Sequence, residues 1–281
     1  MHIIVIPVFD DWKSLNKLLL KIDAVLNAKE LVKILIINDC SKKKPYLNLK
    51  KSNNIKEIKI LELTKNLGSQ KAITVALNYL KKIKSSFYVT IMDSDGEDNP
   101  EHIKNMIYLA KKNKDSVIVS CRKDREENLV IKICYKIHLI LTFFLTARWI
   151  SFGNFSSFHS KNLKKILSDN SAWLAYSAAV MKNVNIKKTY STRLKRFYGK
   201  SKVSVLFLIK HSIKIIGVFY KRVLFFSLFY LLLANELFKS YDSLFLIFIF
   251  TINIVIILNI YKKNKDKEIN FIKNIKKISY D

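Results

Sequence analysis

Four acidic side chains fall within six positions at the end of one short apolar run. The run covers residues 87–92 and is rich in residues that favour β-strands, and it is followed by Asp93, Asp95, Glu97 and Asp98. Carboxylates this close together repel one another unless a cation lies among them. Mg²⁺ and Mn²⁺ prefer carboxylate oxygens and leave coordination positions open for phosphate. The stretch therefore predicts a site for a metal ion and a diphosphate.

The chain around this turn alternates short apolar runs with helical patterns. Strands are expected at the apolar runs 2–6, 33–37, 58–63, 87–92 and 116–120, and the first of them is expected to end at Pro7. Helices are expected at residues 13–26, at residues 71–82 and from Pro100 onward. This alternation predicts an α/β domain with a mainly parallel sheet, whose ligands bind at the carboxyl ends of the strands.

The composition favours a partner with negative charge. The 50 Lys and Arg residues exceed the 22 Asp and Glu residues, which gives a net charge of +28, and half of the residues are hydrophobic. The basic residues are spread over the whole chain, so an anionic membrane surface is a better expectation than nucleic acid. Cys40, Cys121 and Cys134 form no C-x-x-C pair, which fits a reduced cytosolic environment. The first residues lack the apolar core of a signal peptide, so the catalytic part is expected in the cytoplasm.

The second half of the chain is expected to contact a membrane. Residues 129–150 are apolar but carry several basic side chains, which predicts a helix lying against a membrane or a domain. Residues 223–238 and 244–261 are predicted transmembrane helices, and their basic flanks place both outer ends in the cytoplasm. The alternative is a buried helical hairpin in a soluble core. The apolar segments also offer surfaces for a homo-oligomer.

Five segments in order resemble glycosyltransferase family 2, and within it the dolichyl-phosphate mannose synthase-like branch and its bacterial polyprenyl-phosphate relatives. These segments are residues 6–11, 38–41, 66–68, 93–101 and 196–202. The resemblance implies a GT-A fold over residues 1–210, followed by a juxtamembrane segment at 211–222, the two membrane helices within 223–261 and a basic cytoplasmic tail at 262–281. It also implies a multi-pass protein of the inner (cytoplasmic) membrane, with both termini in the cytoplasm.

The resemblance also assigns roles to single residues. It implies that Mg²⁺ or Mn²⁺ binds Asp93, Asp95 and Glu97, where Glu97 replaces a frequent Gln. The nucleotide-sugar pocket would include Pro7, Phe9, Asp11, Asp39, Asp93 and Arg122. Asn38 replaces the first Asp of a usual pair, and Asp39 alone could be a helix cap. Arg196, Ser201 and Lys202 would contact the acceptor phosphate, and Asp95, Arg196 and Lys202 would form the catalytic set. Residues 66–68 are expected to shape a loop and the start of a helix.

The predicted reaction is inverting transfer of a sugar to a polyprenyl phosphate of the undecaprenyl type, which would supply lipid-linked sugar for cell-surface glycans. A phosphate monoester is already a nucleophile at neutral pH, so no general base is needed. Asp169 is the only acid between Glu127 and Glu236, and it could still be a base for a hydroxyl acceptor on a lipid-linked glycan. Residues 151–156 are expected to form a turn that borders the acceptor entrance. A non-catalytic membrane scaffold is the third alternative.

Overall fold

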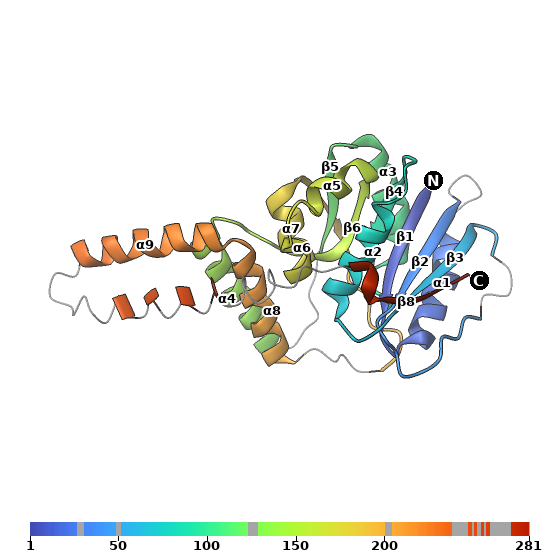
Figure 1. The fold of residues 1–281 in the computed structure, drawn as a ribbon, viewed down its shortest axis with the longest axis horizontal. Helices are drawn as coiled ribbons and strands as arrows, with labels where there is room; N and C mark the ends of the chain where they lie inside the picture. The colour runs from blue at the N-terminus through green and yellow to red at the C-terminus, as the bar shows by residue number, and fades with distance from the viewer. Residues whose placement is uncertain are drawn as a thin grey trace. The chain divides into compact units, whose positions relative to one another are not determined.

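The computed structural model of the protein describes residues 1–26, 31–48, 52–122, 129–199, 204–237 and 271–280, with short pieces between 247 and 258 (Figure 1). The chain forms two compact units. The first contains Met1–Glu126, Ser151–Lys202 and Ile269–Asp281, and the second contains Glu127–Ile150 and Val203–Glu268. This division differs from the expected one at three places, the first being residues 203–210, which belong to the second unit and not to the catalytic domain. Residues 129–150 join the second unit instead of the catalytic domain, and the end of the expected basic tail joins the first unit.

The first unit is built on one mixed sheet. Its eight described strands follow the order β7-β5-β6-β4-β1-β2-β3-β8. Only β6 and β8 run antiparallel to their neighbours. The strands are β1 (His2–Val8), β2 (Val32–Asn38), β3 (Ile55–Leu63), β4 (Tyr88–Ile91), β5 (Ser116–Arg122), β6 (Phe152–His159), β7 (Asn185–Ser191) and β8 (Ile275–Tyr280). All five predicted strands are confirmed, and so is the mainly parallel sheet.

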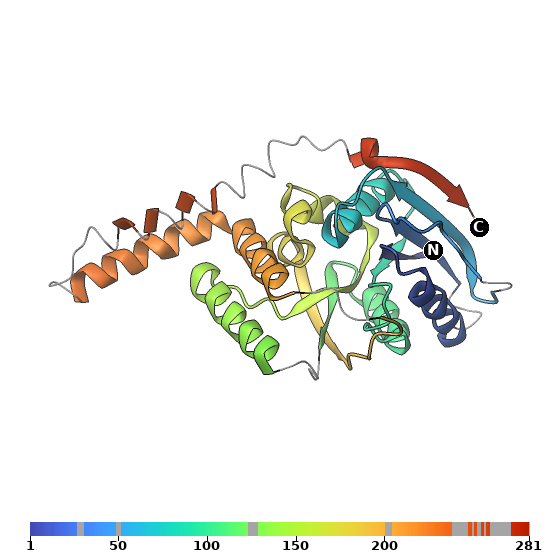
Figure 2. The same cartoon turned by 90° about the horizontal axis from the view of Figure 1, so that it is seen from below.

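Helices cover both faces of this sheet (Figures 1 and 2). On one face α1 packs against alternate residues of β1, β2 and β3 while α3 packs against β4, β5 and β6, and on the other face α2 packs against β1, β2, α6 and α7. Because the central strands are buried on both sides, they read as continuous apolar runs. The helices of this unit are α1 (Trp12–Val25), α2 (Ser69–Leu80), η1 (Pro100–His102), α3 (Ile103–Lys112), η2 (Ser160–Asn162), α5 (Leu163–Ile166), α6 (Ser171–Leu174), α7 (Tyr176–Asn183) and η3 (Phe271–Asn274).

Pro7 does not end the first strand, contrary to the sequence-based expectation. It pairs with Ile37 of β2 inside the parallel ladder. The carbonyl oxygen of Val5 accepts from the backbone N–H of Met92, so odd residues of β1 face β4. Because β4 ends at Ile91, the missing N–H of Pro7 faces a position where the ladder has already stopped. A proline is therefore tolerated at the end of a central strand.

The stretch at residues 151–156 is also not the expected turn, because β6 begins at Phe152. Its buried positions include Ser156 and Ser157, which hydrogen bond to the hydroxyls of Tyr176 and Thr90. A strand that buries hydroxyl groups in place of apolar side chains lacks the usual sequence signal. This antiparallel strand lies between β4 and β5 and carries Asn154 at its start.

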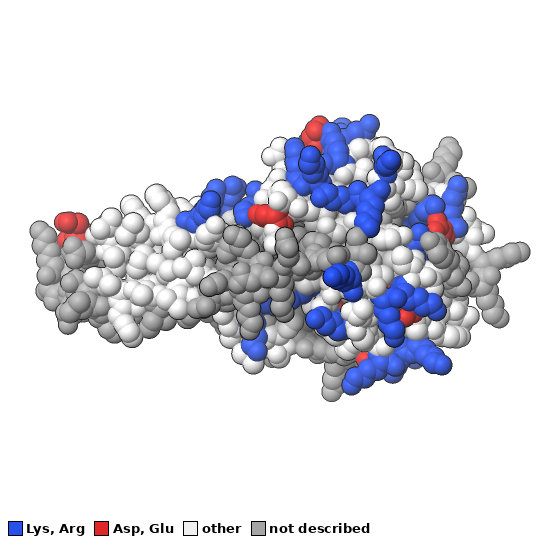
Figure 3. Space-filling view, viewed as in Figure 1, with Lys and Arg blue, Asp and Glu red and all other residues white. Residues whose placement is uncertain are grey.

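The second unit contains the apolar helices α4 (Leu129–Thr146), α8 (Val205–Val218) and α9 (Tyr220–Leu237). The Arg222 guanidinium donates to the carbonyl oxygen of Thr146 at 3.2 Å, and the Tyr230 hydroxyl donates to that of Phe144 at 3.0 Å. These bonds join α9 to α4. Figure 3 shows mostly uncharged side chains along α9 on the visible face.

Within the described part of the chain, no single helix combines the length and apolar character needed to cross a membrane. Residues Val205–Val218 and Tyr220–Leu233 meet these criteria only as a pair, and the pair bends by 90°. The first predicted transmembrane segment falls largely on α9, and most of the second lies outside the described residues. The predicted transmembrane hairpin is therefore not confirmed.

Candidate active site

The acidic turn follows β4 directly and is held by its own side chains. The Asp98 carboxylate accepts from the backbone N–H of Asp93 at 3.0 Å, and the Asp95 carboxylate accepts from that of Glu97 at 3.0 Å. Gly96 occupies the left-handed region with a φ of 83°. Only glycine adopts this conformation without strain, so Gly96 lets the chain reverse within the turn. The carboxylates are thereby placed at the carboxyl end of β4.

Residues 193–198, which we call the covering segment, lie over this turn. The backbone N–H groups of Leu194 and Phe197 donate to the carbonyl oxygens of Glu97 and Asp95, at 2.9 and 3.0 Å. The Phe197 ring lies against Gly96 so closely that a Cβ at that position would be 2.3 Å from a ring carbon. Gly96 is therefore required both for the turn and for the close approach of Phe197.

Two lysines of α1 pack against the aromatic rings of the covering segment. The Nζ of Lys17 lies 5.0 Å from the ring centre of Phe197, and the Nζ of Lys13 lies 4.3 Å from that of Tyr198. A cation within about 6 Å of a ring centre is attracted to the ring face. These contacts hold the covering segment to α1, the helix that follows the first strand.

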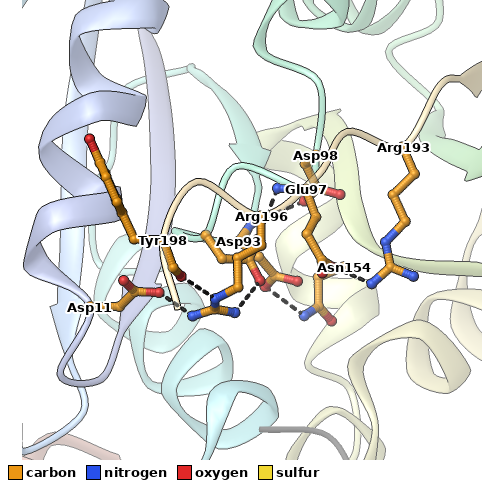
Figure 4. A network of polar contacts seen from close by, with 9 residues as sticks. Asp11, Asp93, Glu97, Asp98, Asn154, Arg193, Arg196 and Tyr198 are labelled. Carbon is orange, nitrogen blue, oxygen red and sulfur yellow. Dashed lines mark hydrogen bonds and ion pairs between the residues drawn. The ribbon is translucent and has the colours of Figure 1, made fainter. Parts of the chain in front are cut away.

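Arg196 brings the two parts of the site together (Figure 4). Its Nη1 donates to Asp95 Oδ2 at 2.9 Å, its Nη2 donates to the Asp11 carboxylate, and its Nε donates to the carbonyl oxygen of Tyr198 at 2.9 Å. The side chains of Arg196, Asp11 and Asp95 are only 21%, 15% and 18% exposed. Ion pairs that are this well buried and hydrogen bonded are stronger than exposed surface pairs.

Arg193 makes a second ion pair, with Glu97. The predicted metal ligand Glu97 thus points its carboxylate at an arginine (Figure 4). Burial first, and then the nearby carboxylates of Asp93 and Glu97, raise the pKa of Asp95 to about 6, although the backbone N–H of Glu97 and the Arg196 guanidinium act to lower it. The site therefore concentrates negative charge to the point where one carboxyl group holds its proton more tightly than usual.

The donor atoms of the acidic turn are carboxylate oxygens, which suit a hard divalent ion. Nowhere in the described residues do three or more His, Cys, Asp or Glu side chains converge as a metal-binding group. Mg²⁺ commonly binds one or two carboxylates and completes its shell with water and substrate phosphates. Asp93 and Asp95, two positions apart on the turn, suit that arrangement. The roles of both residues, and of Glu97, remain predictions.

The residues predicted for the nucleotide lie at the neighbouring strand ends. Pro7 lies in β1 and Phe9 directly after it, and Asp39 follows β2. The Asp39 carboxylate is buried and accepts from the backbone N–H groups of Leu67 and Gly68 at 2.7 and 2.8 Å. Burial raises the pKa of Asp39, and these two hydrogen bonds oppose the change. Asp39 thus shapes the loop before α2, which bears out the structural role expected for residues 66–68.

Several predicted residues cannot be placed in the site. Ser201 and Lys202 lie outside the described residues. Arg122 ends β5, but its side chain is also outside the description. Their predicted contacts with phosphate remain predictions.

Asn154 and Gln70 belong to the site but were not predicted to act in it. Asn154 Nδ2 donates to Asp93 Oδ1 at 3.0 Å, and Gln70 Nε2 donates to Asn154 Oδ1 at 2.8 Å. Asn154 lay in the stretch expected to be a turn, and Gln70 lay beside residues 66–68. The position of β6 next to β4 brings Asn154 to the acidic turn, and Gln70 reaches Asn154 from the start of α2.

Comparisons with known proteins agree with this architecture. The family model described as glycosyl transferase family 2 matches residues 3–175. An uncharacterized glycosyltransferase of Bacillus subtilis (strain 168), YkcC, is 28% identical over 131 residues, which cover 46% of this chain and 39% of the relative. The chain thus matches about two fifths of the length of that relative.

Two solved structures are similar to this chain. Glucosyl-3-phosphoglycerate synthase from Mycobacterium tuberculosis, in complex with Mn²⁺, UDP-glucose and phosphoglyceric acid, has a TM-score of 0.55 at 12% identity, and the match covers 79% of each chain. Staphylococcus aureus TarS 1-349 in complex with UDP-GlcNAc has a TM-score of 0.47 at 16% identity, and the match covers 85% of this chain and 73% of that chain. The first likeness supports a GT-A fold for the sheet unit.

Proposed function

This chain belongs to glycosyl transferase family 2, and we propose that it transfers a sugar from a nucleotide sugar to a polyprenyl phosphate at the cytoplasmic face of a membrane. The observation that carries the proposal is the contact of Arg196 with Asp95 and Asp11. This contact places a phosphate-binding side chain beside the carboxylates that suit a metal-bound diphosphate. One site thereby offers groups for both the donor and an acceptor phosphate.

The donor half of the proposal rests on the acidic turn. The solved glucosyl-3-phosphoglycerate synthase holds Mn²⁺ and UDP-glucose, which supports a nucleotide sugar and a divalent ion here. Mg²⁺ or Mn²⁺ at Asp93 and Asp95 would stabilise the charge that develops on the leaving nucleoside diphosphate. Asp11, directly before α1, would accept a hydrogen bond from the nucleoside once Arg196 releases it.

The acceptor part of the proposal rests on the charge of a phosphate and on the surroundings of Asp169, the candidate base for a hydroxyl acceptor. An acceptor phosphate is mostly dianionic at neutral pH, so it attacks the anomeric carbon without losing a proton first, and configuration inverts. Arg196 would neutralise this phosphate as it approaches. The Asp169 carboxylate accepts hydrogen bonds from the Lys182 ammonium group, the backbone N–H of Ser171 and the Asn183 amide. Burial acts to raise the pKa of Asp169, but its bonds with Lys182 and Ser171 hold it below the ordinary value. An acid of this kind is a poor general base.

The membrane part of the proposal rests on the exposed apolar surface of the second unit. In α4 the exposed apolar positions recur at helical spacing, and Lys132 and Lys136 lie among them. Apolar side chains combined with lysines suit the surface of an anionic bilayer. The exposed positions of α4 are Leu129, Ile133, Ile137, Ile140, Leu141, Phe143 and Phe144. We extend the proposal to a multi-pass topology, in which the two C-terminal apolar segments form a hairpin and both termini are cytoplasmic.

The test is a transfer assay with purified protein, Mn²⁺ or Mg²⁺, a panel of labelled nucleotide sugars and undecaprenyl phosphate. We expect a lipid-linked sugar from at least one donor, and no product from any donor would contradict the proposal. Asp95→Asn should abolish transfer, whereas the matched control Asp169→Asn should retain it.

The same pair of variants tests the second candidate, transfer to a hydroxyl of a lipid-linked glycan. In that case product forms only with the glycan acceptor, and Asp169→Asn becomes inactive as well. A catalytically silent scaffold would bind no nucleotide sugar in the presence of either metal ion.

A further inference from the structure

A chain of side-chain amides connects the start of α2 to the acidic turn. The backbone N–H of Tyr176 donates to Gln70 Oε1 at 2.8 Å, Gln70 Nε2 donates to Asn154 Oδ1 at 2.8 Å, and Asn154 Nδ2 donates to Asp93 Oδ1 at 3.0 Å. Figure 4 shows the last of these contacts, with the Asn154 amide beside the acidic turn. These three hydrogen bonds join α7, α2, β6 and the turn after β4.

The register of the sheet places Asn154 opposite Asp93. In the antiparallel pair of β4 and β6, Ile91 lies opposite Ser156. Asp93 lies two residues after Ile91, and Asn154 lies two residues before Ser156. In an antiparallel pair such residues lie on the same face and close together. Extended two residues past the end of this ladder, the register brings Asp93 and Asn154 to the same side, where their hydrogen bond forms.

The groups at the two ends of this amide row, the Tyr176 N–H and the Asp93 carboxylate, fix the direction of every hydrogen bond between them. A backbone N–H can only donate, so the oxygen of the Gln70 amide must face Tyr176 and its nitrogen must face Asn154. An ionised carboxylate can only accept, so the nitrogen of the Asn154 amide must face Asp93. A flipped Asn154 would place its oxygen against the Asp93 carboxylate, which is repulsive. The two amides thus have only one arrangement that satisfies every partner.

We propose that Gln70 and Asn154 are positioning residues, which hold the Asp93 carboxylate in the orientation that binds the metal ion of the donor. This inference rests on the proposed function, because a metal-bound donor is its premise. Asn154 occupies part of the hydrogen-bonding capacity of Oδ1 and fixes the rotation of the carboxylate. Gln70 fixes the direction in which Asn154 donates. Partners that orient a metal ligand in this way commonly change metal affinity by about 10- to 100-fold when they are removed.

The test measures Mn²⁺ binding by calorimetry with the full chain, in separate titrations with saturating UDP and GDP, so it needs no turnover. Asn154→Ala should weaken Mn²⁺ binding about 10-fold or more, by the usual effect of such partners. Gln70→Ala should weaken it less. The double variant should bind no more weakly than Asn154→Ala alone, because both substitutions break the same chain. Asn78→Ala is the matched control on α2, because the Asn78 amide donates to the carbonyl oxygen of Thr74 within the same helix.

Gln70→Glu separates positioning from simple electrostatics. A new negative charge near the site would by itself tighten Mn²⁺ binding. A glutamate at position 70, however, cannot donate to Asn154, whose amide would turn its oxygen toward Asp93, so we expect weaker binding. This variant also keeps the size of the side chain, which makes it the safer test if Asn154→Ala fails to fold.

The outcomes distinguish the two proposals. If the wild type binds Mn²⁺ and the Asn154 and Gln70 variants bind it equally well, the positioning role is wrong and the proposed function stands. Tighter binding by Gln70→Glu also overturns the positioning role. If the wild type binds no Mn²⁺ with either nucleotide, the metal-dependent function falls together with the inference.

Discussion

Replacing Arg196 by alanine should change metal binding and turnover in opposite directions. The guanidinium donates to Asp95 at 2.9 Å and also pairs with Asp11. A divalent ion that binds Asp95 therefore competes with Arg196 for the charge of this carboxylate. Removing the arginine removes that competitor and its positive charge. We expect Arg196→Ala to bind Mn²⁺ more tightly than the wild type when no nucleotide is present.

The size of this effect follows from the contact. A hydrogen bond between charged groups contributes about 1.5–3 kcal/mol when it is well shielded. Because the Arg196 and Asp95 side chains are 21% and 18% exposed, we take the lower end of this range. About 1.5 kcal/mol corresponds to roughly tenfold tighter binding. Turnover should fall by about 100-fold or more, the usual cost of removing a group that stabilises charge in the transition state.

Electron paramagnetic resonance of free Mn²⁺ measures the first effect and the transfer assay measures the second. Lys182→Ala is the matched control, because Lys182 forms an ion pair with Asp169 and not with the acidic turn. Arg196→Lys should lie between Arg196→Ala and the wild type, since one ammonium group cannot reproduce the two-sided contact of the guanidinium. Weaker Mn²⁺ binding in Arg196→Ala, or unchanged binding with full turnover, would refute the reasoning.

Two further predictions concern stability and the membrane. Burial, followed by the charges of Lys111 and the N-terminus, lowers the pKa of His2 to about 3. Below pH 6.5 the unfolded chain takes up a proton on His2 that the folded chain does not. The free energy of unfolding should therefore fall by about 2 kcal/mol between pH 7.5 and 5. Urea unfolding should show a smaller loss in His2→Gln. In bilayers, a fluorophore on Ile137→Cys should be quenched by nitroxide lipids more strongly than one on Lys136→Cys, in a background without native cysteines; equal quenching would contradict an interfacial α4.

The sequence predicted the parallel strands well because their signal is local. Each buried strand is a short apolar run, and its carboxyl end carries the polar residues of the site. The missed strands lack this signal. In β6 the buried positions include serines, and β7 exposes most of its residues and contains two lysines. The strand β8 lies at the edge of the sheet, next to β3, within what looked like a basic tail. Edge strands often carry lysines, which the periodicity of apolar residues does not reveal.

The composition of the site was likewise easier to predict than its contacts. The carboxylates after β4 and the basic residue Arg196 are visible in the sequence. The pairing of Arg196 with Asp11 joins residues 185 positions apart. The role of Asn154 depends on the register between β4 and an unpredicted strand. Such partners follow from the order of strands in the sheet, which no local pattern specifies.

The ion pairs of the acidic turn imply that metal and phosphate binding are coupled. Arg193 and Arg196 pair with Glu97, Asp95 and Asp11, so a cation that binds Asp95 competes with the arginine that now holds this carboxylate. The displaced guanidinium then needs an anionic partner, because an unpaired charge in a half-buried site is costly. A phosphate group supplies that partner. Each ligand therefore removes the cost of the change that the other one requires, and by reciprocity the metal ion and the phosphate should each strengthen the binding of the other.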